Sequence, residues 1–156
     1  MIRKVYIFFI LALLEIISYG ANFSVAPTRF ELDLNKIATN EVHVFNNTSK
    51  PLRIETYTES DKSFGEKYNL NKNIAVFPKV IAIKPGAKQV VRFRVKPSKE
   101  LAEGENKSYL VFKELPPNIK TTAPKNSEGE TATNISILTE LGISIYGHTG
   151  EAKRKT

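Results

Sequence analysis

Apolar and polar residues alternate with a period of two along this chain, most regularly near its carboxyl end. Successive side chains of a β-strand point to opposite faces, so such alternation places one apolar row on a single face. The pattern predicts a long strand over residues 135–146. One set of alternate positions in it reads Ile135, Ile137, Thr139, Leu141, Ile143 and Ile145, and the other reads Ser136, Leu138, Glu140, Gly142, Ser144 and Tyr146.

Shorter runs of the same kind predict six further strands, whereas a helical period of 3.6 residues is nearly absent after Ala21. Clusters of Pro, Gly and Asn separate the runs, as at residues 46–51 and 84–87. A chain of 156 residues has room for one such domain and not for two. We therefore expect an all-β protein, an immunoglobulin-like β-sandwich of seven to eight strands in a single domain. The further strands are expected at residues 23–25 continuing through 29–34, then at 41–46, 52–59, 73–83, 89–96 and 108–114.

The amino terminus has the order of a secretory signal peptide. Arg3 and Lys4 precede an apolar run over residues 5–14, and small residues follow up to Gly20. An anchor that stays in the membrane remains an alternative, although Glu15 keeps the run below the roughly 20 residues that a spanning helix needs. We expect a signal peptide over residues 1–20 and a folded domain over residues 21–148. The chain has no Cys, so an exported domain of this sequence depends on its core and not on disulfides.

Two segments have compositions that do not support a packed core. Residues 118–134 contain few large apolar side chains and many Pro, Lys, Thr, Asn and Glu, which is typical of a long mobile loop. Residues 149–156 are small or charged, and we expect them to form a disordered basic tail.

No convergent set of catalytic groups stands out. The two histidines, His43 and His148, fall in different predicted strands, and no Gly-x-Gly loop is present. We therefore expect a protein that is not an enzyme, with no catalytic residues, no metal site, no cofactor and no small-molecule substrate.

The chain is basic, with a formal net charge of +7 at pH 7, and such a charge could attract acidic partners. Arg92, Arg94 and Lys96 alternate along one predicted strand face, where they could contact phosphates. A solvated sheet face has the same pattern, and no base-stacking motif accompanies it. We expect no nucleic-acid partner.

Five stretches follow one another in a specific order: Pro-Thr-Arg at 27–29, Val-Phe-Asn-Asn at 44–47, Lys-Pro-Gly-Ala at 84–87 with Val-Val-Arg-Phe at 90–93, Ser-Tyr-Leu-Val-Phe-Lys-Glu-Leu-Pro-Pro at 108–117, and Ile-Ser-Ile-Tyr at 143–146. Together they resemble the N-terminal domain of the periplasmic chaperones of the chaperone-usher pilus pathway. Only the first of that family's two domains is covered. The resemblance implies a non-enzymatic chaperone in the periplasm of a Gram-negative cell, which binds and caps pilin subunits by donor-strand complementation for fimbrial assembly. It implies pilin or fimbrial subunits as partners, with an outer-membrane usher as a further candidate.

The resemblance also implies a donor strand. It makes Ile135, Ile137 and Thr139 the side chains that are lent to a subunit, with Leu141 next in the row. Leu141, Ile143 and Ile145 would then anchor the strand in its own domain. An apolar strand that closes the chain in this way is expected at a sheet edge, where another polypeptide can pair with it.

The family uses an Arg and a Lys to bind the terminal carboxylate of the subunit. Arg29 matches the Arg, while Ser144 stands where the Lys is expected and contributes no charge. The resemblance thus implies a carboxylate anchor at Arg29 and Ser144 that lacks one cation. Two alternatives stay open: Arg29 is a surface residue paired with a neighbouring carboxylate, and the chain is a structural or adhesive immunoglobulin-like module of the cell envelope without chaperone activity.

Overall fold

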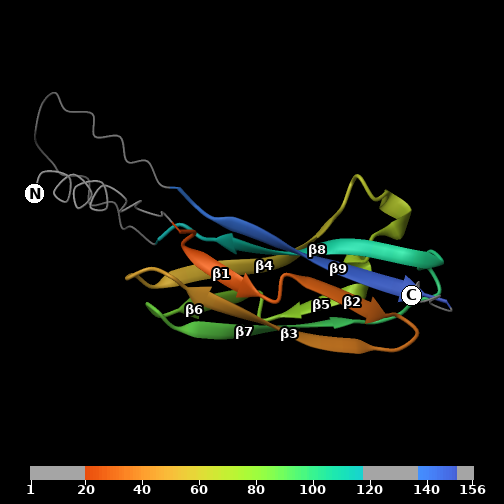
Figure 1. Cartoon of the computed structure of the whole chain (residues 1–156), viewed down its shortest axis with the longest axis horizontal. Helices are drawn as coiled ribbons and strands as arrows, with labels where there is room; N and C mark the ends of the chain where they lie inside the picture. The colour runs from red at the N-terminus through yellow and green to blue at the C-terminus, as the bar shows by residue number, and fades with distance from the viewer. Residues whose placement is uncertain (1–19, 118–136, 151–156) are drawn as a thin grey trace, which may run out of the picture.

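The computed structural model describes residues 20–117 and 137–150, and these contain nine strands and two short 3-10 turns (Figure 1). Most strands alternate buried and exposed residues, as the sequence pattern predicts. The strands are β1 (Phe23–Ala26), β2 (Arg29–Asp33), β3 (Ala38–Asn46), β4 (Leu52–Ser60), β5 (Ile74–Phe77), β6 (Val80–Ile83), β7 (Lys88–Val95), β8 (Gly104–Glu114) and β9 (Glu140–Thr149), and the turns are η1 (Glu66–Tyr68) and η2 (Asn71–Asn73).

The strands form two sheets that pack face to face. One sheet has the order β1-β3-β7-β5, and the other has the order β2-β9-β8-β4-β6. Every pair is antiparallel except β2 with β9, which run parallel. The expected all-β, immunoglobulin-like sandwich is confirmed.

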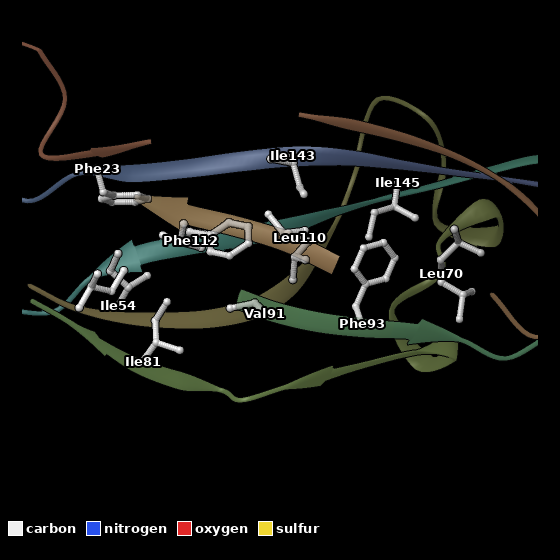
Figure 2. Packing of buried hydrophobic residues seen from close by; sticks show 14 of the residues in the cluster. Phe23, Ile54, Leu70, Ile81, Val91, Phe93, Leu110, Phe112, Ile143 and Ile145 are labelled. Atoms are coloured by element: carbon white, nitrogen blue, oxygen red, sulfur yellow. The ribbon is translucent and has the colours of Figure 1, made fainter. Parts of the chain in front are cut away.

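The core lies between the two sheets. Figure 2 shows Ile143 and Ile145 pointing from β9 of the five-stranded sheet into the core, with Ile145 facing Phe93 of the four-stranded sheet. Phe93 is fully buried and meets the Phe30 ring edge-on, with ring centroids 4.9 Å apart. Burial of these side chains, each contributing about 1.5–3 kcal/mol, stabilises a domain that contains no disulfide. Other fully buried members of the core include Phe23, Val42, Val44, Ile54, Leu70, Ile83, Val91, Leu110 and Phe112.

Two of the predicted strands each divide between the sheets. The run at 23–34 becomes β1 and β2, and the run at 73–83 becomes β5 and β6. Each division falls at a cis X-Pro peptide, Ala26–Pro27 or Phe77–Pro78. Proline has no N–H to give to a ladder, so regular pairing stops there. The described residues therefore form nine strands, where the sequence pattern predicts seven or eight.

The last strand differs from the prediction in its bounds and its place. β9 begins at Glu140 and not at residue 135, and it continues through Thr149, which the sequence prediction places in the tail. The Thr149 hydroxyl donates to the carbonyl of Ala102 at 2.9 Å, and this bond holds the end of the strand. The expectation of an edge position is wrong for Ser144–His148, because β9 lies there between β2 and β8.

Several expected features lie outside the described residues. These are the signal peptide up to residue 19, the loop over residues 118–134, the donor residue Ile135 and the tail from residue 151. Among the residues that the structure describes, no helix has the length and apolar character needed to cross a membrane.

Candidate functional site

The apolar row of β9 passes from the core of the domain to its surface. Ile145 and Ile143 are 0% and 1% exposed, and Leu141 packs against the edge of the same core. Thr139 is half-buried, and Ile137 is 84% exposed. The row therefore begins outside the domain's own core, although its members share one alternation pattern.

The exposed part of the row adjoins an open backbone edge. β2 pairs with β9 only from Ser144 onward, where the Ser144 N–H donates to the carbonyl of Thr28 at 3.1 Å. Before that point, Glu140–Ile143 pair with β8 on one side. Among the described residues no strand lies on their other side. This short edge of β9 can accept another strand.

The two residues of the implied carboxylate anchor lie side by side. Arg29 and Ser144 are register partners in the parallel pair of β2 and β9. The guanidinium donates from Nε and Nη2 to Glu31 at 3.0 and 2.7 Å, and both side chains are more than half exposed. The hydrogen bond to Glu31 raises the pKa of Arg29 above its ordinary value. The contact with Glu31 agrees with the alternative that Arg29 is a surface residue paired with a neighbouring carboxylate. The Arg29 side chain nevertheless remains accessible to solvent.

A second cation lies close to this anchor, and no pattern in the sequence marks it. The Lys107 ammonium lies 5.1 Å from the centre of the Tyr146 ring, while the Arg29 guanidinium lies 4.1 Å from the same centre. Phe64, in the loop after β4, packs edge-on against the Tyr146 ring, with the ring centroids 6.5 Å apart. Tyr146 therefore contacts two cations that belong to strands on either side of β9.

Lys107 is already paired within the domain. Its ammonium donates to Asp61 Oδ2 at 2.7 Å, and the Tyr109 hydroxyl donates to the same oxygen at 2.9 Å. The side chains of Lys107 and Asp61 are 12% and 9% exposed. The pairing raises the pKa of Lys107 and, together with a bond from Ser63, lowers the pKa of Asp61. Since Asp61 already balances the charge of Lys107, Arg29 is the accessible cation of the two.

The other polar residues considered from the sequence do not come together into a site. His43 lies in β3 of one sheet and His148 in β9 of the other. Arg92 pairs with Glu41 at 2.7 Å on an exposed strand face. In the part of the chain that the structure describes, no group of three His, Asp or Glu side chains could hold a metal ion.

Comparison with known proteins gives a family match and a set of similar folds. Residues 22–143 match the family described as "Pili and flagellar-assembly chaperone, PapD N-terminal domain". No curated protein sequence matches the chain. The fold is similar to the Escherichia coli chaperone DraB, with a TM-score of 0.60 and 14% identity over 84% of this chain.

Two complexes contain similar folds. The Salmonella enterica SafB chaperone in complex with the SafA pilin matches with a TM-score of 0.60 and 14% identity over 86% of this chain. The CsuC–CsuE chaperone-tip adhesion subunit complex of Acinetobacter baumannii matches with a TM-score of 0.55 and 17% identity over 83% of this chain. In all three comparisons this chain spans 57% of the length of the matched chain.

Proposed function

Because the chain belongs to the family of pilus and flagellar-assembly chaperones, as their PapD N-terminal domain, we propose that it caps pilin subunits in the periplasm by lending them the segment that leads into β9. The observation that carries the proposal is the rise in side-chain exposure along one apolar row, from buried Ile145 to Ile137 at 84%, beside a stretch of β9 that no described strand pairs on its outer side. An added strand would gain backbone hydrogen bonds from that edge. It would also bury the exposed side chains, at about 1.5–3 kcal/mol for a fully buried Ile.

The anchor gives the docked subunit a second point of attachment. Arg29 can exchange Glu31 for the terminal carboxylate of a subunit, because its guanidinium is exposed and presents two N–H donors. Ser144 lies directly opposite on β9 and offers a hydroxyl to the same carboxylate. A charge-assisted hydrogen bond of this kind contributes about 1.5–3 kcal/mol.

The test compares two neighbouring substitutions in the exposed segment. The tagged full chain is produced in the periplasm of a Gram-negative host together with pilin subunits, and co-purified proteins are identified. Ile137→Asp should abolish subunit capture and leave the circular dichroism of the domain unchanged. Leu138→Asp, on the other set of alternate positions and 40% exposed, is the matched control and should retain capture.

Two results would count against the proposal. If Ile137→Asp captures subunits as well as the unchanged chain, the apolar row is not what the subunit binds. If the unchanged chain captures no pilin subunit at all, the structural or adhesive envelope module is the better description.

A further inference from the structure

A buried carboxylate holds the segment that precedes β9. Glu114, the last residue of β8, is 6% exposed. Its Oε2 accepts hydrogen bonds from Asn22 Nδ2 at 2.8 Å and from the backbone N–H of Thr139 at 3.1 Å. A charged group is costly to bury unless hydrogen bonds compensate for the lost water, so these two bonds determine where the carboxylate sits.

The bond to Thr139 continues the pairing of β8 and β9 beyond its last ladder pair. That ladder ends with Lys113 opposite Glu140. One residue further, the backbone N–H of Glu114 donates to the carbonyl of Thr139 at 2.9 Å. The Thr139 N–H in turn donates a hydrogen bond to the Glu114 side chain. Glu114 therefore satisfies both backbone polar groups of Thr139, which lies two positions after the exposed Ile137.

The carboxylate is itself braced by the start of the domain. Asn22, its other donor, accepts a hydrogen bond at its carbonyl from the Asn47 N–H at 3.0 Å, just after β3. On the far side of β8, the Leu115 N–H donates to the carbonyl of Arg53 in β4 at 2.8 Å. Glu114 is thus tied to elements that do not belong to the β9 segment.

We propose that Glu114 is a positioning residue for subunit capture: it fixes the direction in which Ile137 and Leu138 leave the domain, so that the donated segment is partly ordered before a subunit arrives. This inference rests on the proposed function. A segment held in its bound direction loses less conformational entropy on binding, and affinity rises for that reason alone. Glu114 itself lies inside the domain, on a strand other than the one that is lent.

Two substitutions separate the length of the side chain from its charge. Glu114→Gln keeps the length and an amide oxygen that can accept from Thr139, but loses the charge. Glu114→Asp keeps the charge but is one methylene shorter and cannot reach Thr139. We expect Glu114→Asp to weaken capture of a co-purified pilin subunit by about tenfold or more and Glu114→Gln by less than about threefold. The control is Glu103→Gln, an exposed carboxylate just before the other end of β8, which should not change capture.

A measurement on the free protein separates this inference from the proposed function. Hydrogen exchange at the Thr139 amide should become at least about tenfold faster in Glu114→Asp, with thermal unfolding of the domain little changed. The inference is overturned if Glu114→Asp binds as tightly as the unchanged chain, or if Glu114→Gln is as weak as Glu114→Asp. It is also overturned if Thr139 exchange does not change. Ile137→Asp in the same capture assay tests the donor segment itself: if that variant still captures subunits, it is the proposed function that fails.

Discussion

The guanidinium of Arg29 lies 4.1 Å from the centre of the Tyr146 ring. The contact follows from the parallel pairing of β2 and β9, in which Arg29 is opposite Ser144 and Glu31 is opposite Tyr146. A cation over an aromatic face at an exposed site gains about 0.5–1 kcal/mol. The ring therefore keeps Arg29 on the outer face of the sheet, beside the open edge of β9.

Arg29→Ala should weaken subunit capture by about tenfold or more, because it removes the charge-assisted bond that we propose to the terminal carboxylate. The measurement is the dissociation constant for a subunit with a free carboxyl terminus and for the same subunit amidated there. The unchanged chain should prefer the free carboxylate, and Arg29→Ala should bind both forms alike. An equal loss for both forms would mean that Arg29 contacts some other part of the subunit.

Glu31→Gln should strengthen capture of the free-carboxylate subunit by up to about fivefold. In the absence of a subunit, the Arg29 guanidinium is bonded to Glu31, which would compete with the subunit carboxylate. An exposed ion pair of this kind contributes at most about 1 kcal/mol. The same assay measures the effect, and high salt should reduce it. Weaker capture in Glu31→Gln would show that Glu31 orients Arg29 and does not compete with the subunit.

Ile143→Ala and Ile137→Ala should differ in their effect on folding. Ile143 is 1% exposed, and its truncation should lower the free energy of unfolding by about 2–5 kcal/mol. Ile137 is 84% exposed, and its truncation should change that free energy by less than about 0.5 kcal/mol. Urea denaturation measures both. A large loss in Ile137→Ala would place Ile137 in the domain's own core and remove it from the donor row.

Two glycines of β9 should respond differently to an added methyl group. A Cβ on Gly147 would lie 2.7 Å from Cγ of Leu34, which is itself buried, so Gly147→Ala should cost about 1–3 kcal/mol of stability. A Cβ on Gly142 would meet Tyr109 no closer than 3.8 Å, an ordinary contact. Gly142→Ala is therefore the matched control and should be nearly neutral in the same denaturation experiment.

Asp61→Asn should lower the melting temperature at neutral pH, because it breaks the pair with Lys107. The pKa of Asp61 is lowered in the folded protein by its bonds to Lys107, Ser63 and Tyr109. A lowered carboxyl pKa stabilises the fold above the ordinary value of 3.8, and this stabilisation is lost as the pH falls below that value. The difference in melting temperature between the two proteins should therefore be constant near neutrality and shrink below pH 3.8. A difference that persists unchanged in acid would mean that the ion pair does not stabilise the fold.

Local pattern was sufficient to locate most of the strands but not to assign them to sheets. The alternation at residues 41–46, 52–59 and 89–96 predicts β3, β4 and β7 to within a few residues. The runs at 23–34 and 73–83 looked continuous, because both halves alternate in the same way. Only the tertiary structure shows that each half joins a different sheet.

The candidate site also has one part that the sequence predicts and one part that only the structure shows. The apolar row of the last strand can be read from the sequence, since alternation is a property of neighbouring residues. Its division into buried Ile143 and Ile145 and exposed Ile137 depends on where β2 and the opposite sheet end. The contacts of Lys107 with Asp61 and of Glu114 with Asn22 join residues 46 and 92 positions apart, and no local signal marks them.

That the chain forms strands, and which of their side chains share a face, follows from local alternation, because a two-residue period acts through the backbone of each strand alone. The pairing of distant strands is what places Arg29 beside Ser144 and covers one half of β9 on both sides, while no described strand covers the outer side of its other half. Those outcomes depend on the pairing of strands that are distant in the chain, and that pairing is set by how the two faces pack into one core.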